Sequence, residues 1–297
     1  MPEKGRKKEF PKLALLVKDL YFIVSWTTSD ILSEKMIKFK NENNDEMDAF
    51  LAVPDGKKVS NFVVVIQEIW GLTDFLKSVA QRIAKLGFAA VAPDLYSRKG
   101  QRGKFTQEVI MDAMRPFWSL PADKRRDKAE VEKIMSKLSP EAREIVTLLM
   151  FNRDKMEEQM VSDLQSLYRH MDSSGFNGRR GVIGFCMGGG LAFELSTRIP
   201  VDASAIYYGA SPKNIEDVGK ITGSVLGIYA GEDSGINDGL PDLMKAMLKH
   251  KKEWDMKLYP GTYHAFFNHT GMSYNEEASK DAWERTVSLF TKKIGVE

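Results

Sequence analysis

Short runs of consecutive apolar residues, separated by segments with helical spacing, restrict the fold of this chain more than any other feature. Residues 62–66 are five apolar residues in a row, as expected of a strand covered on both faces. A second run at 88–91 is followed by Pro93, and Thr73 or Asp74 can cap a helix between the two runs. This alternation of strands and helices favours an α/β fold with a mostly parallel sheet.

The alternation resumes in the C-terminal half of the chain. Strands are expected at 181–185, 203–208, 224–230 and 254–259, and helices at 188–198, 240–250 and 276–294. The chain has 297 residues, which is enough for a sizeable core. The sequence therefore predicts a large α/β domain with helices on both faces of its sheet.

Charge and cysteine content narrow the classes of function. The chain carries 43 basic and 41 acidic residues, a net charge of +2, so no excess of positive charge indicates nucleic-acid binding. A single cysteine cannot form an internal disulfide bond. We therefore expect a cytoplasmic protein whose thiol stays reduced and available for chemistry.

Residues 1–35 are predicted to form an N-terminal helical extension. Positions 1–12 are basic and positions 13–26 are mostly apolar, with Lys18 and Asp19 inside the apolar run. The run is too short to span a membrane. An amphipathic helix is the favoured interpretation, with attachment to a membrane surface and a cleaved signal peptide as the alternatives.

One face of this expected helix bears on assembly. Val17, Leu20, Tyr21 and Val24 fall at helical spacing on that face. The face can pack on its own domain or on a second copy of the chain. The protein is accordingly expected to be a monomer or a homodimer.

The main domain is expected at 36–297, beginning with a hairpin or edge strand at 38–54. Within it, residues 99–160 are rich in charged side chains with scattered Met and Leu, and 130–138 and 141–150 show helical spacing. We interpret 99–160 as a helical insertion that lies over the core. The alternative is a solvated pair of linker helices with no role at a site.

The strongest local signal is the segment 184–189, Gly-Phe-Cys-Met-Gly-Gly, which follows an apolar strand and begins a helix of small residues. This context is typical of a nucleophile elbow, in which the nucleophile lies on a sharp turn from strand to helix. Gly184 and Gly188 would allow close approach of neighbouring backbone. Cys186 is then the nucleophile, and the amide of Met187 at the helix start is the natural oxyanion donor.

The segment 184–189 has two alternative interpretations. A lone cysteine is often a small, inert core residue. A glycine-rich turn from strand to helix can also bind a dinucleotide, but the glycines at 184, 188, 189 and 190 do not fit the G-x-G-x-x-G spacing.

The partners of such a nucleophile follow it in the order acid, then histidine. Asp233 comes just after the expected strand at 225–230, and His264 follows the strand at 256–259. Carboxyl ends of parallel strands meet at one edge of the sheet, so both side chains should reach the elbow. Asp238 and Glu232 are the alternative candidates for the acid.

For the base, the rival is His269, which lies five residues beyond His264. The two remaining histidines, His170 and His250, fall in polar helical stretches and are expected at the surface.

Five segments together resemble the dienelactone hydrolases, a family with the α/β-hydrolase fold. The resemblance spans about 36–297 apart from the insertion, and a cysteine elbow combined with Gln-Glu-Ile-Trp-Gly is quite specific to the family. The segments are Gln-Glu-Ile-Trp-Gly-Leu at 67–72, Ala-Pro-Asp-Leu-Tyr at 92–96, the elbow at 184–189, Gly-Glu-Asp at 231–233, and Tyr-Pro-Gly-Thr-Tyr-His-Ala-Phe at 259–266.

The resemblance implies a triad of Cys186, His264 and Asp233. It also implies that Glu68 contacts the thiol, and that the amides of Ile69 and Met187 form the oxyanion hole. Apolar surroundings should raise the pKa of Glu68 and make it a poised proton acceptor. The alternative for Glu68 is a simple ion pair with an arginine.

In the family, two arginines hold a carboxylate of the substrate. Only one of these two positions is an arginine in this sequence. Arg98 occupies the first position and is a candidate substrate-binding residue. Asn268 stands at the second, four residues after His264, and supplies no positive charge. The alternative is that an arginine of the insertion replaces it, among them Arg102, Arg115, Arg125 and Arg126, and the sequence does not distinguish between them.

The sequence thus predicts a cysteine-dependent hydrolase of small esters or lactones that acts through a thioester acyl-enzyme. We expect no metal ion and no organic cofactor. The alternatives are a non-catalytic binding protein on the same scaffold and a related enzyme of C–C bond cleavage or acyl transfer.

Overall fold

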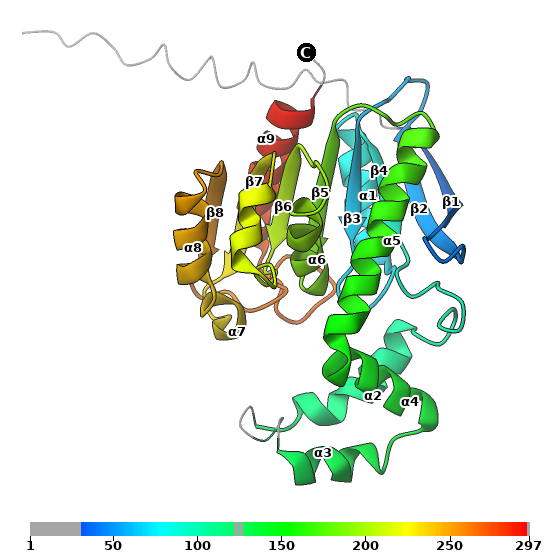
Figure 1. The fold of residues 1–297 in the computed structure, drawn as a ribbon, viewed down its shortest axis with the longest axis vertical. Helices are drawn as coiled ribbons and strands as arrows, with labels where there is room; N and C mark the ends of the chain where they lie inside the picture. Colours follow the sequence, from blue (N-terminus) through cyan, green and yellow to red (C-terminus); the bar gives the residue numbers. More distant parts are fainter. Residues whose placement is uncertain (1–30, 122–123, 125–126, 296–297) are drawn as a thin grey trace, which may run out of the picture.

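An eight-stranded sheet organises the part of the chain that the computed structural model describes, residues 31–121, 124 and 127–295 (Figure 1). The predicted helix at 13–26 lies outside these residues. The strands are β1 (Leu32–Lys40), β2 (Glu46–Pro54), β3 (Phe62–Ile66), β4 (Ala89–Pro93), β5 (Arg180–Phe185), β6 (Ala203–Tyr207), β7 (Ser224–Ala230) and β8 (Trp254–Tyr259).

The order across the sheet is β1-β2-β4-β3-β5-β6-β7-β8. Strand β2 is antiparallel to β1 and β4, and every other neighbouring pair is parallel. The predicted mostly parallel α/β sheet is therefore confirmed. Because β3, β5, β7 and β8 run in the same direction, the loops after them meet at one edge.

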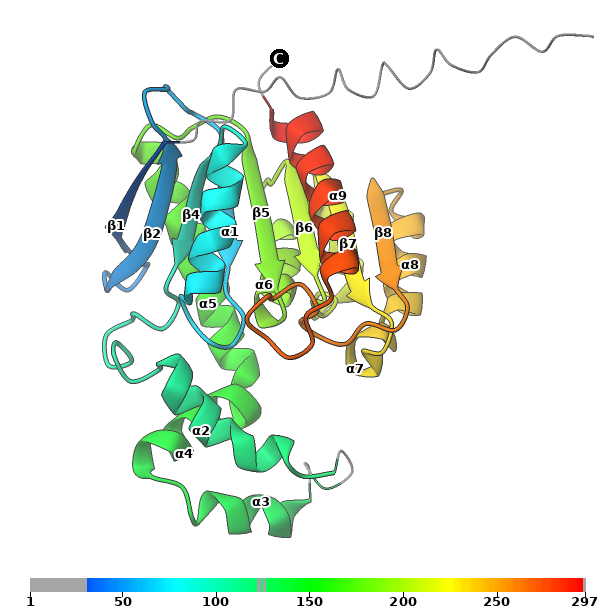
Figure 2. The same cartoon turned by 180° about the vertical axis from the view of Figure 1, so that it is seen from behind.

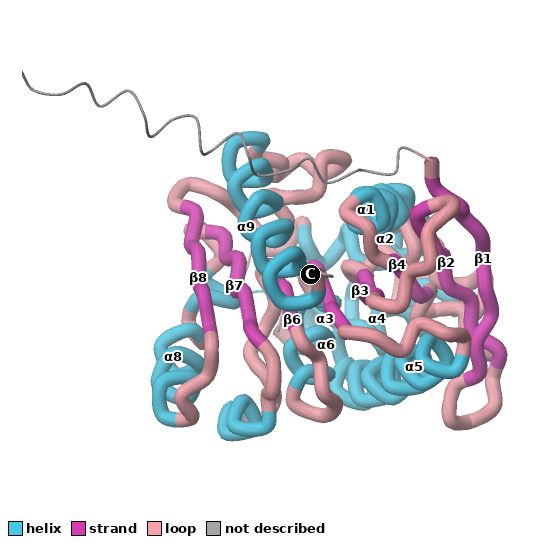
Figure 3. Tube along the Cα trace, turned by 90° about the horizontal axis from the view of Figure 1, so that it is seen from above, coloured by secondary structure: helices cyan, strands magenta, loops and turns pink. Residues whose placement is uncertain are grey.

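Helices cover both faces of the sheet, as its apolar strands require. One face carries α1 (Asp74–Lys85) and α9 (Glu276–Ile294), and the other carries α5 (Arg153–Ser173), α6 (Met187–Ser196) and α8 (Leu240–Lys249) (Figures 2 and 3). Alternate residues of β3 divide between the two cores. Val63 and Val65 pack with α1 and α9, whereas Val64 and Ile66 pack with α5 and α6.

The first strand begins earlier than the sequence indicated. β1 starts at Leu32, so the predicted boundary between residues 35 and 36 falls inside a strand that pairs with β2. Its residues up to Met36 are largely exposed because β1 is the edge of the sheet. An exposed edge strand needs no apolar alternation, which is why the pattern did not reveal it.

Between β4 and β5, three helices lie beyond the carboxyl end of the sheet (Figure 1). They are α2 (Gln107–Trp118), α3 (Lys128–Met135) and α4 (Pro140–Val146), followed by a π-helical turn (Thr147–Phe151). Ser139 caps α4 by accepting a hydrogen bond from the amide of Ala142 at 3.1 Å, with Pro140 at the first helical position.

The predicted end of the insertion at residue 160 falls within α5. That helix begins in the insertion and continues to Ser173, packing against α6 and β1. Its second half therefore belongs to the α/β layers. Among the described residues, no helix is long and apolar enough to cross a membrane.

Candidate active site

Cys186 lies on a strained turn between β5 and α6. Its backbone angles are φ 56° and ψ −118°, a left-handed conformation that a residue with a Cβ rarely adopts. A Cβ on Gly184 would collide with the backbone of Gly188, and one on Gly188 would collide with the carbonyls of Ile66 and Gln67. The glycines therefore have the steric role expected of a nucleophile elbow.

Asp233 and His264 meet at the same edge of the sheet. Asp233 follows β7 and begins the short helix α7 (Ser234–Asn237), and His264 lies in the loop after β8. The distance between Asp233 Oδ2 and His264 Nδ1 is 2.5 Å. The Asp233 side chain is only 12% exposed, so this hydrogen bond is largely shielded from water.

The rival residues do not make this contact. Asp238 and Glu232 are exposed. His269 is exposed and lies near the Phe75 ring. Of these candidates, Asp233 and His264 are the pair that the structure brings into contact.

The other two histidines lie away from the elbow. His250 binds Glu216 at 2.7 Å. His170 is half-buried, with its ring centroid 6.3 Å from that of Phe39, and is less exposed than predicted.

The surroundings of His264 favour its protonated form. Burial lowers the pKa of this imidazole, but hydrogen bonds to Asp233 and Cys186 outweigh it and raise the pKa to about 10. His264 can therefore hold the proton of the Cys186 thiol as an imidazolium at neutral pH.

Glu68, just after β3, is a buried carboxyl group with few hydrogen bonds to offset the loss of contact with water. Its side chain is buried, and its Oε2 accepts a hydrogen bond of 2.7 Å from Asn268 Nδ2, while Oε1 has no partner among the described residues. Burial raises the pKa of Glu68 to about 7, although Asn268 and His264 act to lower it. The predicted alternative, an ion pair of Glu68 with an arginine, is not observed, and its partner among the described residues is the neutral amide of Asn268.

Two contacts that the sequence did not reveal hold the segment 67–70 in place. Gln67 Oε1 accepts from the amide of Leu95 at 3.0 Å, and the Tyr96 hydroxyl donates to the carbonyl of Ile69 at 2.9 Å. The segment at 92–96 thus orients the backbone beside Glu68. No local pattern could indicate these pairs, because each joins residues 27 or 28 positions apart.

The two predicted oxyanion donors come from different segments, Ile69 from the loop after β3 and Met187 from the start of α6. Met187 is the first residue of α6, where a helix leaves its N–H groups without intrahelical acceptors. Ile69 is fixed by the Tyr96 hydroxyl through its carbonyl. Ile69 also lines the cavity that contains Cys186.

This cavity has a volume of about 890 Å³ and is enclosed by two sets of residues. The first set, here called the sheet wall, consists of Glu68, Ile69, Trp70, Cys186, His264 and Ala265. The second set, the insertion wall, consists of Met114, Trp118, Lys128, Val131, Leu149, Met150, Phe151 and Arg153. Residues of the insertion therefore line the cavity that contains Cys186.

Arg98 does not belong to either wall. Its guanidinium forms an ion pair with Asp163 of α5, whose side chain is fully buried and also accepts from Asn41 at 3.1 Å. The expectation that Arg98 binds substrate is corrected accordingly. A buried carboxylate requires a partner of opposite charge, and Arg98 is that partner for Asp163.

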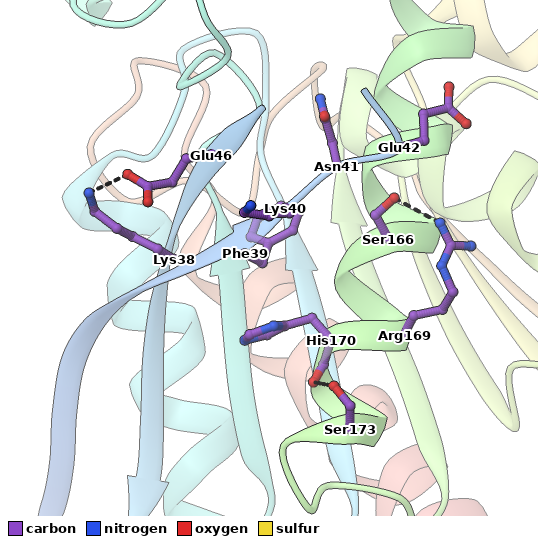
Figure 4. Close-up of a pocket in the computed structure, with 10 residues that line it drawn as sticks. All are labelled: Lys38, Phe39, Lys40, Asn41, Glu42, Glu46, Ser166, Arg169, His170 and Ser173. Carbon is purple, nitrogen blue, oxygen red and sulfur yellow. Dashed lines mark hydrogen bonds and ion pairs between the residues drawn. The ribbon is translucent and has the colours of Figure 1, made fainter. Parts of the chain in front are cut away.

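A second cavity, of about 500 Å³, lies between β1 and α5 (Figure 4). It contains His170, but its hydroxyl groups point to backbone carbonyls. Ser166 donates to Ser162 at 3.1 Å, and Ser173 donates to the His170 carbonyl at 2.9 Å. No hydroxyl in it is paired with the imidazole, so this cavity lacks the arrangement found at Cys186.

In the described part of the chain, no cluster of three or more His, Cys, Asp or Glu side chains could hold a metal ion.

Comparison with known proteins agrees with this geometry. The family model described as "Dienelactone hydrolase family" matches residues 47–294, which include Glu68, Cys186, Asp233 and His264. The chain belongs to the dienelactone hydrolase family. It is a dienelactone hydrolase-like hydrolase with an α/β-hydrolase fold.

Relatives of the dienelactone hydrolase family match over most of their length. A protein of Saccharolobus solfataricus named "Putative carboxymethylenebutenolidase" is 44% identical over 254 residues, covering 86% of this chain and 97% of the relative. A protein of the same name from Methylorubrum extorquens is 30% identical and covers 84% of this chain and 77% of the relative.

Among solved structures, the "Putative Dienelactone Hydrolase" of Klebsiella pneumoniae superposes with a TM-score of 0.67 at 22% identity, covering 89% of this chain and all of that one. This likeness supports the fold of the family.

Proposed function

We propose that this chain hydrolyses small esters or lactones, with Cys186 as nucleophile, His264 as general base and acid, and Asp233 as the residue that orients His264. One observation carries the proposal. The cysteine on the strained elbow shares a cavity with a histidine whose other ring nitrogen is bound to a shielded carboxylate. This is the arrangement that activates a nucleophile for acyl transfer.

In the first step the Cys186 thiolate attacks the carbonyl carbon of the substrate. A C–S bond forms, and the carbonyl electron pair moves to oxygen. The C–O bond to the leaving group then breaks as the oxyanion collapses, and His264 gives its proton to the departing oxygen. The product of this step is a thioester, and in a lactone the new hydroxyl stays attached to the acyl group.

In the second step water attacks the thioester carbonyl. His264, now neutral, takes a proton from the water, so the new C–O bond forms without free hydroxide. The C–S bond breaks and its electron pair returns to sulfur. A carboxylic acid leaves, and the thiolate–imidazolium pair is restored with one water consumed.

The amides of Ile69 and Met187 are proposed to bind the oxyanion in both steps. The Met187 amide lies at the amino end of α6, where the helix dipole also favours negative charge. Tyr96 keeps Ile69 in place through its carbonyl. Donors fixed in advance stabilise charge without reorganisation during the reaction.

Glu68 is proposed to take the proton of the Cys186 thiol as the substrate enters and to pass it to His264, so that the thiolate–imidazolium pair of the first step is formed. Its raised pKa, about 7, allows it to gain or lose a proton near neutral pH. Its Oε1 has no partner in the described residues and can accept a further hydrogen bond. We also propose a reducing, cytoplasmic setting, because the nucleophilic thiol must stay reduced.

The test is hydrolysis of p-nitrophenyl acetate and of an unsaturated lactone by wild type and by Cys186→Ala. We expect the variant to lose about 10³-fold or more in kcat/KM for both substrates. Mass spectrometry of quenched wild-type reactions should find the acyl group on Cys186, the only cysteine. Equal turnover by the two proteins would contradict the proposal.

A further inference from the structure

The insertion wall presents an apolar surface to the cavity that contains Cys186. Six of its eight residues are apolar: Met114, Trp118, Val131, Leu149, Met150 and Phe151. The groups used in the proposed reaction, by contrast, come from the elbow and from the loops that follow the strands. The insertion wall therefore faces the part of a substrate that does not react.

Two aromatic residues of this wall keep much of their surface in water. Phe151 is 54% exposed and Trp118 is 36% exposed, although both line the cavity. Exposed apolar surface that is gathered in a hollow is typical of a ligand-binding site, because a ligand covers it and removes it from water. Trp118 also meets Trp70 of the sheet wall, with ring centroids 5.4 Å apart, so the apolar surface continues from one wall to the other.

The backbone brings three successive apolar residues to this surface. Leu149, Met150 and Phe151 are the last residues of the π-helical turn between α4 and α5. The amide of Asn152 closes the turn by donating to the carbonyl of Thr147, five residues earlier, at 2.8 Å. Turns of this kind are rare and frequently lie at functional sites, and this one places all three residues on the cavity.

The cavity is larger than a small lactone requires. An apolar cavity of about 150 Å³ holds a benzene ring, so a single ring would leave most of the volume of about 890 Å³ empty. Cavities of roughly 300–1,000 Å³ enclose ligands of the size of a drug molecule. The insertion wall thus leaves room for a bulky group beside the reacting carbonyl.

We propose that the insertion wall binds a large apolar acyl group of the substrate while the ester or lactone carbonyl lies at Cys186. The proposal rests on the function proposed above and narrows its substrate class to esters and lactones with a long aliphatic or aromatic acyl group. His264 protonates the leaving oxygen, so the alcohol lies towards the sheet wall. The acyl group, on the other side of the carbonyl carbon, then extends towards the insertion wall.

The two cations of the insertion wall are compatible with an apolar occupant. Lys128 and Arg153 are both exposed. Arg153 Nε donates to Glu157 Oε1 at 2.6 Å, so its charge has a partner on its own helix. The charged ends of such side chains can stay in water while an apolar chain lies against the neighbouring residues.

The first test measures kcat/KM for p-nitrophenyl acetate, butyrate, hexanoate and octanoate, each below its micelle concentration. These esters share one leaving group and differ in acyl length. We expect kcat/KM to rise about two- to fourfold with each added methylene group, mostly through KM, because the wall removes each methylene from water. A series that is flat, or that falls from acetate to octanoate, would overturn the proposal.

The second test changes the wall itself. Phe151→Asn replaces an exposed aromatic side chain with a polar one, and the ratio of kcat/KM for octanoate to that for acetate should fall about tenfold. Met36→Asn is the matched control, because Met36 is also 54% exposed and lies on β1, outside the cavity. An unchanged ratio in Phe151→Asn, or an equal fall in both variants, would refute the role of the wall.

The third test uses Cys186, the only cysteine, as a probe and does not depend on hydrolysis. N-ethylmaleimide and N-hexylmaleimide carry the same reactive ring and differ in the length of their chain. The ratio of the hexyl rate to the ethyl rate should exceed that for glutathione by about tenfold in wild type and in Met36→Asn, and by less in Phe151→Asn. Equal ratios for the wild-type protein and for glutathione would contradict the proposal.

The two proposals fail in different ways. Hydrolysis of p-nitrophenyl acetate that survives Cys186→Ala would contradict the proposed function. Hydrolysis that depends on Cys186 but does not favour longer acyl groups would leave that function standing and overturn the role of the insertion wall.

Discussion

The two walls of the cavity are built in different ways. The sheet wall is fixed by backbone geometry and by hydrogen bonds. Cys186 is held by its left-handed elbow, Ile69 by the Tyr96 hydroxyl, and His264 by Asp233. The insertion wall consists mainly of apolar side chains on helices that pack on one another beyond the sheet. One wall holds atoms in place, and the other supplies surface.

This difference assigns the walls different tasks. Bond-making atoms must be held within fractions of an ångström, which a turn between strand and helix achieves. Selectivity depends on contacts with the rest of the substrate, which a helical layer can change without moving the nucleophile. We therefore expect changes in the sheet wall to alter kcat and changes in the insertion wall to alter KM.

The largest effect is expected from Asp233→Asn, which acts on the sheet wall. The amide cannot stabilise the imidazolium, so the pKa of His264 should fall from about 10 towards its ordinary value. Above that lower pKa the proton leaves His264. We predict that kcat falls by about 10³-fold and that the alkaline limb of its pH profile moves to lower pH.

The control for this prediction is Asp238→Asn, an exposed carboxylate at the end of α7. It should keep the wild-type profile. If Asp233→Asn kept the wild-type kcat and pH limb, the bond between Asp233 and His264 would have no part in catalysis.

The variant Arg98→Met tests whether Arg98 stabilises the folded protein or binds substrate. Arg98→Met leaves the Asp163 carboxylate buried with only Asn41 as partner. We expect the free energy of unfolding to fall by about 3 kcal/mol in urea titrations. The double variant Arg98→Met with Asp163→Leu should recover part of that loss.

The sheet wall could largely be predicted from the sequence, and the insertion wall could not. The elbow, Asp233 and His264 follow strands, and the ends of parallel strands meet at one edge whatever the loops contain. The topology of a parallel sheet was therefore sufficient to place these three residues near one another.

Residues on the helices between β4 and β5 obey no such rule. Which face of α5 meets the cavity depends on how α2, α3 and α4 pack, so Arg153 could not be distinguished from other charged residues in 99–160. The family resemblance indicates Arg98 as a substrate-binding residue, whereas its partner in the structure is Asp163, which lies 65 positions away where no local pattern links the two.

A third prediction concerns the buried Glu68. Its pKa is about 7 in the folded protein against 4.5 ordinarily, so the folded state keeps a proton that the unfolded chain loses between these values. Stability is therefore lost as pH rises from about 4.5 to 7. Glu68→Gln can still accept from Asn268 and carries no charge.

The difference in free energy of unfolding between Glu68→Gln and wild type should grow by up to about 3 kcal/mol from pH 4 to pH 8. Urea titrations at several pH values measure it. Glu284→Gln, an exposed substitution on α9, is the control and should show no such trend. A constant difference across the range would mean that the pKa of Glu68 is the same in the folded and the unfolded protein, contrary to the prediction.

The smallest effect is expected where the two walls touch. Trp118 of the insertion wall meets Trp70 of the sheet wall edge-on, with ring centroids 5.4 Å apart. Trp118→Ala removes apolar surface from the cavity without moving Cys186, so KM for a neutral ester should rise about three- to tenfold while kcat changes less than twofold. Leu248→Ala on α8, 73% exposed and outside the cavity, is the control. A fall in kcat larger than the rise in KM would show that the insertion helps to hold the reacting atoms, and the division of tasks between the walls would fail.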